Sequence, residues 1–332
     1  MALIDSFGRA IRYLRVSVTD RCNLQCDYCR PAGEPILPTH EQLLTLEEIA
    51  RLGRIFVGLG IDRIRLTGGE PLLRRNLVTL VGNLAAIPGL HELSLTTNAL
   101  LLDRFALALR QAGLQRVNIS LDTLDPATFF RITQGGDVLR VLAGIEAAVA
   151  AGLHPVKINM VVMRGVNDHE IPNMIAFAVQ HGLVLRFIET MPVGRAGLNS
   201  AERYVSADEI VALARAGDGQ EWIPVLHPKE QGSGPARYFR IPGSMAEVGI
   251  ISARSRHFCD TCNRMRLTSR GELVLCLGGM DQVDLKTSMR GGATDAELAA
   301  LILDAVLRKP QRHHFELGAD SGSAWNMSGL GG

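Results

Sequence analysis

The sequence lacks the features of a membrane or exported protein. No apolar run reaches the roughly 18 residues that a membrane helix needs, and the first residues show no basic stretch followed by an apolar core. We therefore expect a cytoplasmic protein with no membrane partner. Thiols stay reduced in that compartment, so six cysteines suggest metal or redox chemistry before disulfides.

Net charge is also almost absent. Lys and Arg number 35 against 34 Asp and Glu, which leaves a formal charge of +1. This balance argues against an extended nucleic-acid surface, although it allows a local basic pocket. The 332 residues are 47% hydrophobic and 21% charged, which is typical of a folded globular protein with one large domain or two ordinary ones.

The cysteines form two groups of three, and neither group has a fourth member. The first group lies in "RCNLQCDYCR" and the second in "FCDTCNRMRLTSRGELVLC"; they consist of Cys22, Cys26 and Cys29, and of Cys259, Cys262 and Cys276. Zinc sites and four-cysteine iron–sulfur sites usually have a fourth ligand. Three thiolates around a four-iron cluster bind three irons, and the fourth iron stays open to a small molecule.

A repeated pattern between residues 13 and 190 predicts the fold. Short alternating strands recur about every thirty residues, each followed by a loop and a helix that ends in Gly plus an apolar residue. The strands are expected at 13–19, 63–67, 92–97, 116–121, 156–162 and 184–190. The helices are expected at 45–57, 75–86, 104–112, 126–132, 138–151 and 169–181. Six βα units in series predict an α/β fold with an incomplete (βα)6 TIM-like barrel.

Alternation within these strands separates apolar from polar side chains. Leu14 and Val16 share one face of the first strand and Arg15 lies on the other, and later strands place Arg65 and Lys157 on the polar face. Strands of an ordinary parallel sheet are apolar on both faces, so the polar face is expected to line the barrel lumen. An antiparallel sheet with one wet face is the alternative. Because buried cations need partners, we predict an anionic ligand with several phosphates.

The first cysteine group follows the first strand, at the rim where barrel active sites lie. Instead of a cluster, this group could form a zinc site completed by His or Asp, or a disulfide with a spare thiol. In this position C-x3-C-x2-C resembles the radical S-adenosylmethionine (SAM) superfamily, as does the Gly-Gly-Glu-Pro turn in "LTGGEPLLR" at 66–74. The resemblance implies that the amino and carboxylate groups of SAM bind the open iron. It also places Tyr28 at the adenine, while Ala99 stands where relatives usually have Gly.

The βα pattern stops near residue 200. We therefore divide the chain into a radical SAM partial barrel at 1–200 and a C-terminal α+β region at 201–332 that covers the barrel mouth. Short strands are expected at 222–227, 236–241, 247–252 and 264–268, and a helix at 295–307. A zinc site completed by His257 or Asp260 remains an alternative for the second cysteine group. Arg264 and Arg266 share one face of their strand. An arginine pair on a strand usually lies in solvent, but beside an iron–sulfur cluster it predicts a clamp for a polyphosphate.

The run from Phe258 to Leu277, the N-terminal "LRVSVTDRCNLQCDYCRP" and "RKPQRHHF" at 308–315 resemble the GTP 3′,8-cyclase family. This resemblance implies SAM contacts at Tyr28, Gly69, Ser120 and Met191. It implies GTP contacts at Arg15, Arg65, Thr96, Lys157, Arg264, Met265 and Arg266. Residues with a catalytic role would be Arg15, Lys157, Arg264, Arg266, Gly331 and Gly332. The open iron of the second cluster would bind the guanine base.

The implied reaction uses two [4Fe–4S] clusters and SAM. A 5′-deoxyadenosyl radical removes hydrogen from C3′ of GTP, and the product is (8S)-3′,8-cyclo-7,8-dihydroguanosine 5′-triphosphate, the first step of molybdenum cofactor biosynthesis. An external electron donor and a downstream cyclic pyranopterin monophosphate synthase are the implied partners, with a homodimer as one option. Two alternatives remain for the function. One is a peptide-modifying radical enzyme with an auxiliary cluster, and the other is a non-catalytic nucleotide-binding protein with two zinc sites.

The last twelve residues, "SGSAWNMSGLGG", resemble a flexible end in composition. Trp325 and Met327 are large apolar residues that a solvated tail does not need, and Gly331-Gly332 is narrow enough to approach a ligand by its backbone. Relatives in the same family end in this pair. We therefore predict that the tail enters the barrel.

Overall fold

The fold was analysed in a computed structural model. It describes residues 2–29, 38–194, 197, 200–218, 222–225, 234–241, 247–279, 281–313, 315 and 327–330. Trp325, Gly331 and Gly332, which the sequence places in the tail, lie outside this part of the chain.

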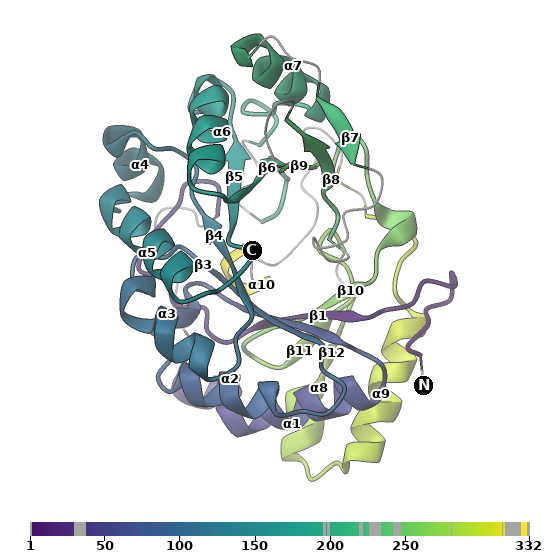
Figure 1. Ribbon diagram of the computed structural model, residues 1–332. Helices are drawn as coiled ribbons and strands as arrows, with labels where there is room; N and C mark the ends of the chain where they lie inside the picture. Colours follow the sequence, from purple (N-terminus) through teal and green to yellow (C-terminus); the bar gives the residue numbers. More distant parts are fainter. Residues whose placement is uncertain are drawn as a thin grey trace.

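One curved sheet organises the described residues. Its first six strands run parallel in chain order: β1 (Tyr13–Ser17), β2 (Arg63–Thr67), β3 (Glu92–Thr97), β4 (Arg116–Ser120), β5 (Lys157–Val162) and β6 (Val184–Glu189). Helices surround this curve on its outer side, as Figure 1 shows. They are α1 (Leu46–Gly58), α2 (Leu77–Ala85), α3 (Leu102–Gln111), α4 (Pro126–Thr133), α5 (Val138–Ala150) and α6 (Ile171–Gln180). The predicted incomplete barrel is therefore confirmed, and each predicted element agrees with an observed one to within a few residues.

Later strands extend this sheet on both sides. β10 (Arg264–Leu267) pairs parallel with β1, and β9 (Glu247–Ile251) pairs parallel with β6. Antiparallel partners follow outward: β11 (Glu272–Val274) and β12 (Gln282–Asp284) beyond β10, and β8 (Arg237–Arg240) and β7 (Ile223–Val225) beyond β9. Within the described residues, β12 and β7 are the two ends of the sheet. The second cysteine group is thus carried by strands that continue the barrel.

The C-terminal helices are α7 (Ala207–Asp218), α8 (Leu285–Arg290), α9 (Asp295–Leu307) and the short α10 (Met327–Leu330). Sequence analysis predicted α9 correctly but missed α7, α8, β11 and β12. The missed strands have three residues each, too few for alternation to be recognised. Helix α10 lies in the middle of the ring of strands (Figure 1).

The apolar side of the strands packs beneath the helices. Leu14 and Val16 of β1 and Ile64 of β2 are 0–2% exposed and belong to one continuous core. Helix α1 begins with a capping box, in which the Thr45 side chain accepts from the Glu48 backbone and the Glu48 side chain accepts from the Thr45 backbone. Such a cap stabilises a helix by about 1 kcal/mol. The opposite strand faces are left to line the lumen.

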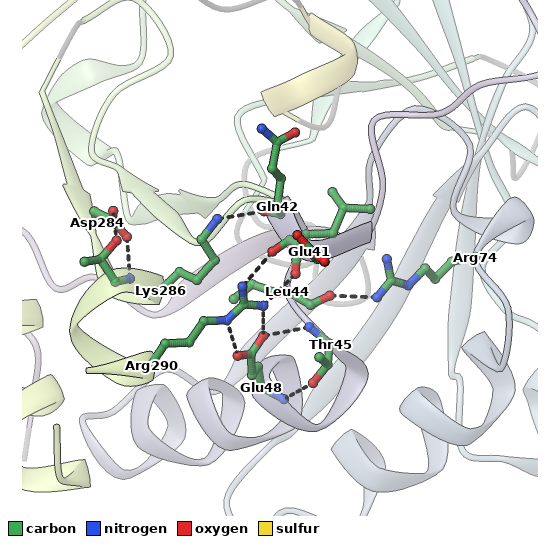
Figure 2. Close-up of polar contacts among 11 residues, drawn as sticks. Glu41, Gln42, Leu44, Thr45, Glu48, Arg74, Asp284, Lys286 and Arg290 are labelled. Carbon is green, nitrogen blue, oxygen red and sulfur yellow. Dashed lines mark hydrogen bonds and ion pairs between the residues drawn. The ribbon is translucent and has the colours of Figure 1, made fainter. Parts of the chain in front are cut away.

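A polar junction ties α8 to the segment that leads into α1 (Figure 2). Arg290 donates to both carboxylate oxygens of Glu48, at 2.8 and 3.0 Å, and to the carbonyl oxygens of Glu41 and Leu43. Lys286 donates to the carbonyl of Gln42 at 2.7 Å. The chain that returns from the first cysteine loop is therefore held by the C-terminal region.

None of the helices in the described part of the chain combines the length and apolar character needed to cross a membrane.

Candidate active site

The first cysteine group lies in the loop after β1, at the carboxyl end of the parallel strands. Cys22, Cys26 and Cys29 are partly buried, carry no disulfide, and line the main cavity of the barrel. Burial is the main cause that raises the pKa of the Cys26 thiol, and the charge of Cys29 adds to it. Three thiols facing a shared cavity are the arrangement predicted for an iron–sulfur cluster.

The Gly-Gly turn after β2 packs directly against this loop. The Gly69 N–H donates to the Thr19 carbonyl at 2.8 Å, and the Glu70 N–H donates to the Arg21 carbonyl at 2.7 Å. A Cβ atom added to Gly69 would lie 2.2 Å from the Arg21 carbonyl oxygen. Only glycine allows so close an approach, so the turn fixes the backbone immediately before Cys22.

Glu70 links this turn to the end of β3, a contact that sequence analysis missed. Its buried carboxylate accepts from the Thr97 hydroxyl at 2.7 Å and from the Asn98 N–H at 2.8 Å. Burial raises the pKa of Glu70 to about 7, and these hydrogen bonds oppose the shift. Ala99 follows with φ of 62°, the left-handed conformation in which glycine is the common residue. The Gly-to-Ala departure therefore leaves the expected turn in place.

Tyr28 lines the cavity as predicted, and its hydroxyl has an unpredicted partner. It donates to the carboxylate of Asp122 at 2.7 Å, while the other carboxylate oxygen accepts from the Val161 N–H at 2.9 Å. Burial raises the pKa of Asp122 to about 6, although both hydrogen bonds oppose this. Asp122 comes two residues after the end of β4, a position at the barrel rim that could have indicated it.

Arginines form a row across the floor of the lumen. Strand pairing places Arg15 directly beside Arg65 on one side and beside Arg266 on the other. Burial and the neighbouring Arg266 lower the pKa of Arg15 well below its usual value, and burial lowers the pKa of Arg65 and of Arg266 to about 10. Like charges side by side oppose each other unless an anion lies between them. The row is thus arranged for an anionic ligand.

Two further arginines join the row without having been predicted. Arg116 forms an ion pair with Glu92, and Arg186 donates to the Asn118 amide oxygen at 2.7 Å. Both side chains line the cavity. Sequence analysis predicted the sixth strand but did not place Arg186 in the lumen, although Arg186 alternates with the buried apolar Leu185 and Phe187, a signal that could have indicated it.

Lys157, at the start of β5, is fully buried. Its ammonium is 5.8 Å from the centre of the Tyr238 ring. Burial and, after it, the charges of Arg186, Arg116 and Arg65 together lower its pKa to about 6. Lys157 is on the lumen side of β5, as predicted, but it is not among the residues that line the main cavity.

The other predicted residues divide into two sets. Thr96, Ser120, Met191 and Arg264 line the main cavity together with Gly69. The Met265 side chain is 1% exposed and packs in the hydrophobic core, because it alternates with Arg264 and Arg266 along β10. Met265 is nevertheless among the residues that line the cavity of the second cysteine group.

The second cysteine group lines a neighbouring cavity. Cys259 is buried, and Cys262 and Cys276 are partly buried. Arg264 and Arg266 line this cavity as well as the main one, so the two cavities meet at these arginines. Burial would raise the pKa of Cys262, but the charges of Lys309 and Arg264 outweigh it and lower the pKa. These charges thus favour the thiolate form of Cys262, whereas burial raises the pKa of Cys259.

The thiol groups fit clusters that each lack one protein ligand. Among the described residues, no three His, Cys, Asp or Glu side chains converge closely enough to share a single metal ion. The thiolates of a cluster each bind a different iron, so they need not converge in that way. Two sets of cavity-facing cysteines without disulfide bonds are compatible with two clusters.

The described end of the chain lies in the same place. Leu330 is 1% exposed and packs with Val193 and Val274. Met327 packs against this small cluster and lines the main cavity. The tail therefore contacts the barrel through residues 327–330.

Comparison with known proteins identifies the family. The model of the radical SAM superfamily matches residues 16–178, and the model described as Molybdenum Cofactor Synthesis C matches residues 183–315. A curated GTP 3′,8-cyclase of Hydrogenovibrio crunogenus is 46% identical over 333 residues, which cover 100% of both chains. The GTP 3′,8-cyclase of Moorella thermoacetica is 50% identical over 328 residues, with 99% of both chains covered.

Among solved structures, Streptococcus suis SuiB bound to S-adenosylmethionine is similar with a TM-score of 0.60. It is 13% identical, and the match covers 89% of this chain and 69% of that chain. At this identity the likeness concerns the fold alone.

Proposed function

The chain belongs to the GTP 3′,8-cyclase family of the radical SAM superfamily, and we propose that it binds GTP between its two cysteine groups. The enzyme converts GTP to (8S)-3′,8-cyclo-7,8-dihydroguanosine 5′-triphosphate, the first step of molybdenum cofactor biosynthesis. Its cofactors are two [4Fe–4S] clusters and SAM. When bound, the first cluster and SAM supply the means to remove the C3′ hydrogen, and the second cluster supplies an open iron for the guanine base.

One observation carries the proposed binding mode: the row of Arg266, Arg15 and Arg65 across three adjacent strands. Three guanidinium groups spaced along a cavity match the length and charge of a triphosphate. Lys157, on the lumen side of β5, would contact the same phosphates. Arg264 and Arg266 border both cavities, so a nucleotide held there can reach the second cysteine group with its base.

The residues around the first cysteine group would hold SAM. Tyr28, Gly69, Ser120 and Met191 all line the main cavity, as do the three thiols of the first cysteine group. The Tyr28 hydroxyl is fixed by Asp122, so its ring has one orientation for stacking on adenine. Holding both reactants rigidly selects one hydrogen of the ribose among several.

The tail and the C-terminal strands would complete the site. Residues 327–330 contact the lumen and would exclude water from the reacting atoms. We further propose that the division at residue 200 separates the radical SAM barrel from the region that covers its mouth. The proposal has four remaining parts: location in the cytoplasm, an external one-electron donor, transfer of the product to cyclic pyranopterin monophosphate synthase, and assembly as a homodimer.

GTP deuterated at C3′ tests the reaction in this chain. The anaerobic protein is incubated with SAM, dithionite and labelled GTP, and both products are analysed by mass spectrometry. We expect the cyclised nucleotide in equal amount to 5′-deoxyadenosine that carries one deuterium. Unlabelled 5′-deoxyadenosine would contradict the site of hydrogen removal, and no cyclised product would contradict the activity.

A further inference from the structure

Arg9, which precedes β1, contacts the second cysteine group. Its Nη1 donates to the carbonyl oxygens of Cys259 at 2.9 Å and Gln311 at 2.7 Å, and its Nη2 donates to that of Pro310 at 2.7 Å. Its Nε donates to Asp5 at 2.6 Å. Arg9 is 8% exposed. A single buried guanidinium therefore joins the N-terminal segment, one cysteine of the group and the segment that follows α9.

Lys309 reaches the same cysteine group from another direction. Its ammonium donates a hydrogen bond to the carbonyl of Leu275, the residue before Cys276, and the residue is 2% exposed. Lys309 lines the cavity of the three thiols, and the described lining of that cavity contains no Asp or Glu. None of the ion pairs found among the described residues includes Lys309.

A buried ammonium is costly unless a negative charge lies close to it. Among the described residues that line this cavity, the groups that can carry negative charge are the three thiols, as thiolates bound to a cluster. The hydrogen bonds support the same interpretation, because Arg9 donates to the carbonyl of Cys259 and Lys309 donates to the carbonyl of the residue before Cys276. The position of Lys309 is thus explained by the cluster and by no acidic side chain among the described residues of the cavity.

We propose that Arg9 and Lys309 are positioning residues for the second cluster. They hold the backbone at Cys259 and beside Cys276, and they place positive charge next to the cluster. The inference rests on the proposed function only in that the second cysteine group binds a four-iron cluster. Its physical consequence is specific: nearby positive charge stabilises the more negative, reduced cluster and so raises its reduction potential.

The variant Lys309→Met tests this charge effect, because it keeps the length and apolar stem of the side chain. The holoenzyme is titrated with a graded reductant, and the reduced second cluster is followed by its electron paramagnetic resonance signal. At a fixed potential we expect the ratio of reduced to oxidised second cluster to fall about tenfold, which corresponds to 59 mV for a one-electron couple. The ratio for the first cluster in the same sample should not change.

Two companion variants make the result interpretable. Lys309→Arg keeps the positive charge and should restore the potential. Arg308→Met removes the same charge from the neighbouring residue, whose side chain is 53% exposed and pairs with Asp304, and it should leave both clusters unchanged. An unchanged potential in Lys309→Met overturns the proposal.

Loss of the second cluster is also decisive. If Lys309→Met loses half of its iron while Lys309→Arg keeps all of it, the requirement for a positive charge is upheld. If both variants lose the cluster equally, the charge has no separate role and the proposal is wrong. Iron for only one cluster in the wild-type chain would contradict the proposed function itself, which is a different outcome from any of these.

Discussion

Arg266 Nη1 donates a hydrogen bond to the carbonyl oxygen of Leu330 at 3.0 Å. A residue of the proposed triphosphate site is therefore bound to the described end of the chain. Because Arg266 also stands beside Arg15 in the arginine row, the position of the tail and the position of the nucleotide are linked through one guanidinium.

Deletion of Gly331 and Gly332 should reduce cyclisation sharply and leave both clusters and GTP binding nearly intact. The preceding residues already reach Arg266, so a pair without side chains can approach the nucleotide by its backbone. Activity is measured as cyclised product per 5′-deoxyadenosine, together with iron content and GTP affinity. Full cyclisation by the truncated protein would show that the tail is a dispensable end.

Removal of either cysteine group should remove one cluster. Replacement of Cys22, Cys26 and Cys29 by Ala should leave about half of the iron and abolish SAM cleavage. Replacement of Cys259, Cys262 and Cys276 by Ala should also leave about half of the iron, abolish cyclisation and permit slow uncoupled SAM cleavage. Iron and acid-labile sulfide are measured on anaerobically purified protein. Full iron content in either variant would refute the two-cluster assignment.

Single replacement of Arg15 or Arg266 by Ala should weaken GTP binding about 10- to 150-fold, since a charge-assisted contact contributes about 1.5–3 kcal/mol. Arg186→Ala should have a similar effect, although sequence analysis did not identify it. The matched control is Arg237→Ala, since Arg237 is exposed in β8 and does not line the cavity. Equal GTP affinity in all four variants would exclude the lumen as the triphosphate site.

GTP binding should take up a proton at Lys157. The pKa of this ammonium is about 6 in the free protein, since burial and then Arg186, Arg116 and Arg65 disfavour the charge, while Glu92 favours it. Phosphate oxygens would raise the pKa, so above pH 6 binding charges the lysine and affinity falls as pH rises. Calorimetry in buffers of different ionisation enthalpy measures the proton. Lys157→Met should lack this uptake; identical uptake in the variant would assign the proton elsewhere.

The same pKa has a consequence for stability without ligand. An unfolded lysine keeps its proton up to its usual pKa of 10.5, whereas the folded one loses it near 6. The unfolded chain therefore binds more protons between these values, and the contribution of Lys157 to the free energy of unfolding rises with pH across that window.

Arg290→Met should lower the free energy of unfolding by about 1–3 kcal/mol, because it removes hydrogen bonds to the Glu48 carboxylate and to two carbonyl groups. The junction in Figure 2 joins the C-terminal region to the barrel, so the loss should be seen in thermal unfolding at equal iron content. Arg256→Met is the control, since its ion pair with Asp208 is mostly exposed and should contribute under about 1 kcal/mol. Equal melting temperatures in the two variants would show that the junction does not hold the regions together.

The sequence alone was sufficient to predict features that depend only on residues close together in the chain. Cysteine spacing predicted two ligand groups, and the cysteines of each group line one cavity in the folded chain. Alternation identified the lumen side of Arg15, Arg65 and Lys157, because successive strand residues point to opposite faces whatever the strand pairs with. Helix and strand positions followed from the same periodicity.

Tertiary structure decided which of these residues meet. Arg15 and Arg266 are register partners across β1 and β10, and Arg9 binds a carbonyl 250 residues away. Nothing in local periodicity specifies which strand adds to which edge of the sheet, since that depends on how all strands pack together. The row of arginines, the Tyr28–Asp122 contact and the cations beside the second cysteine group therefore emerge only from the folded chain, in which long-range pairing fixes their neighbours.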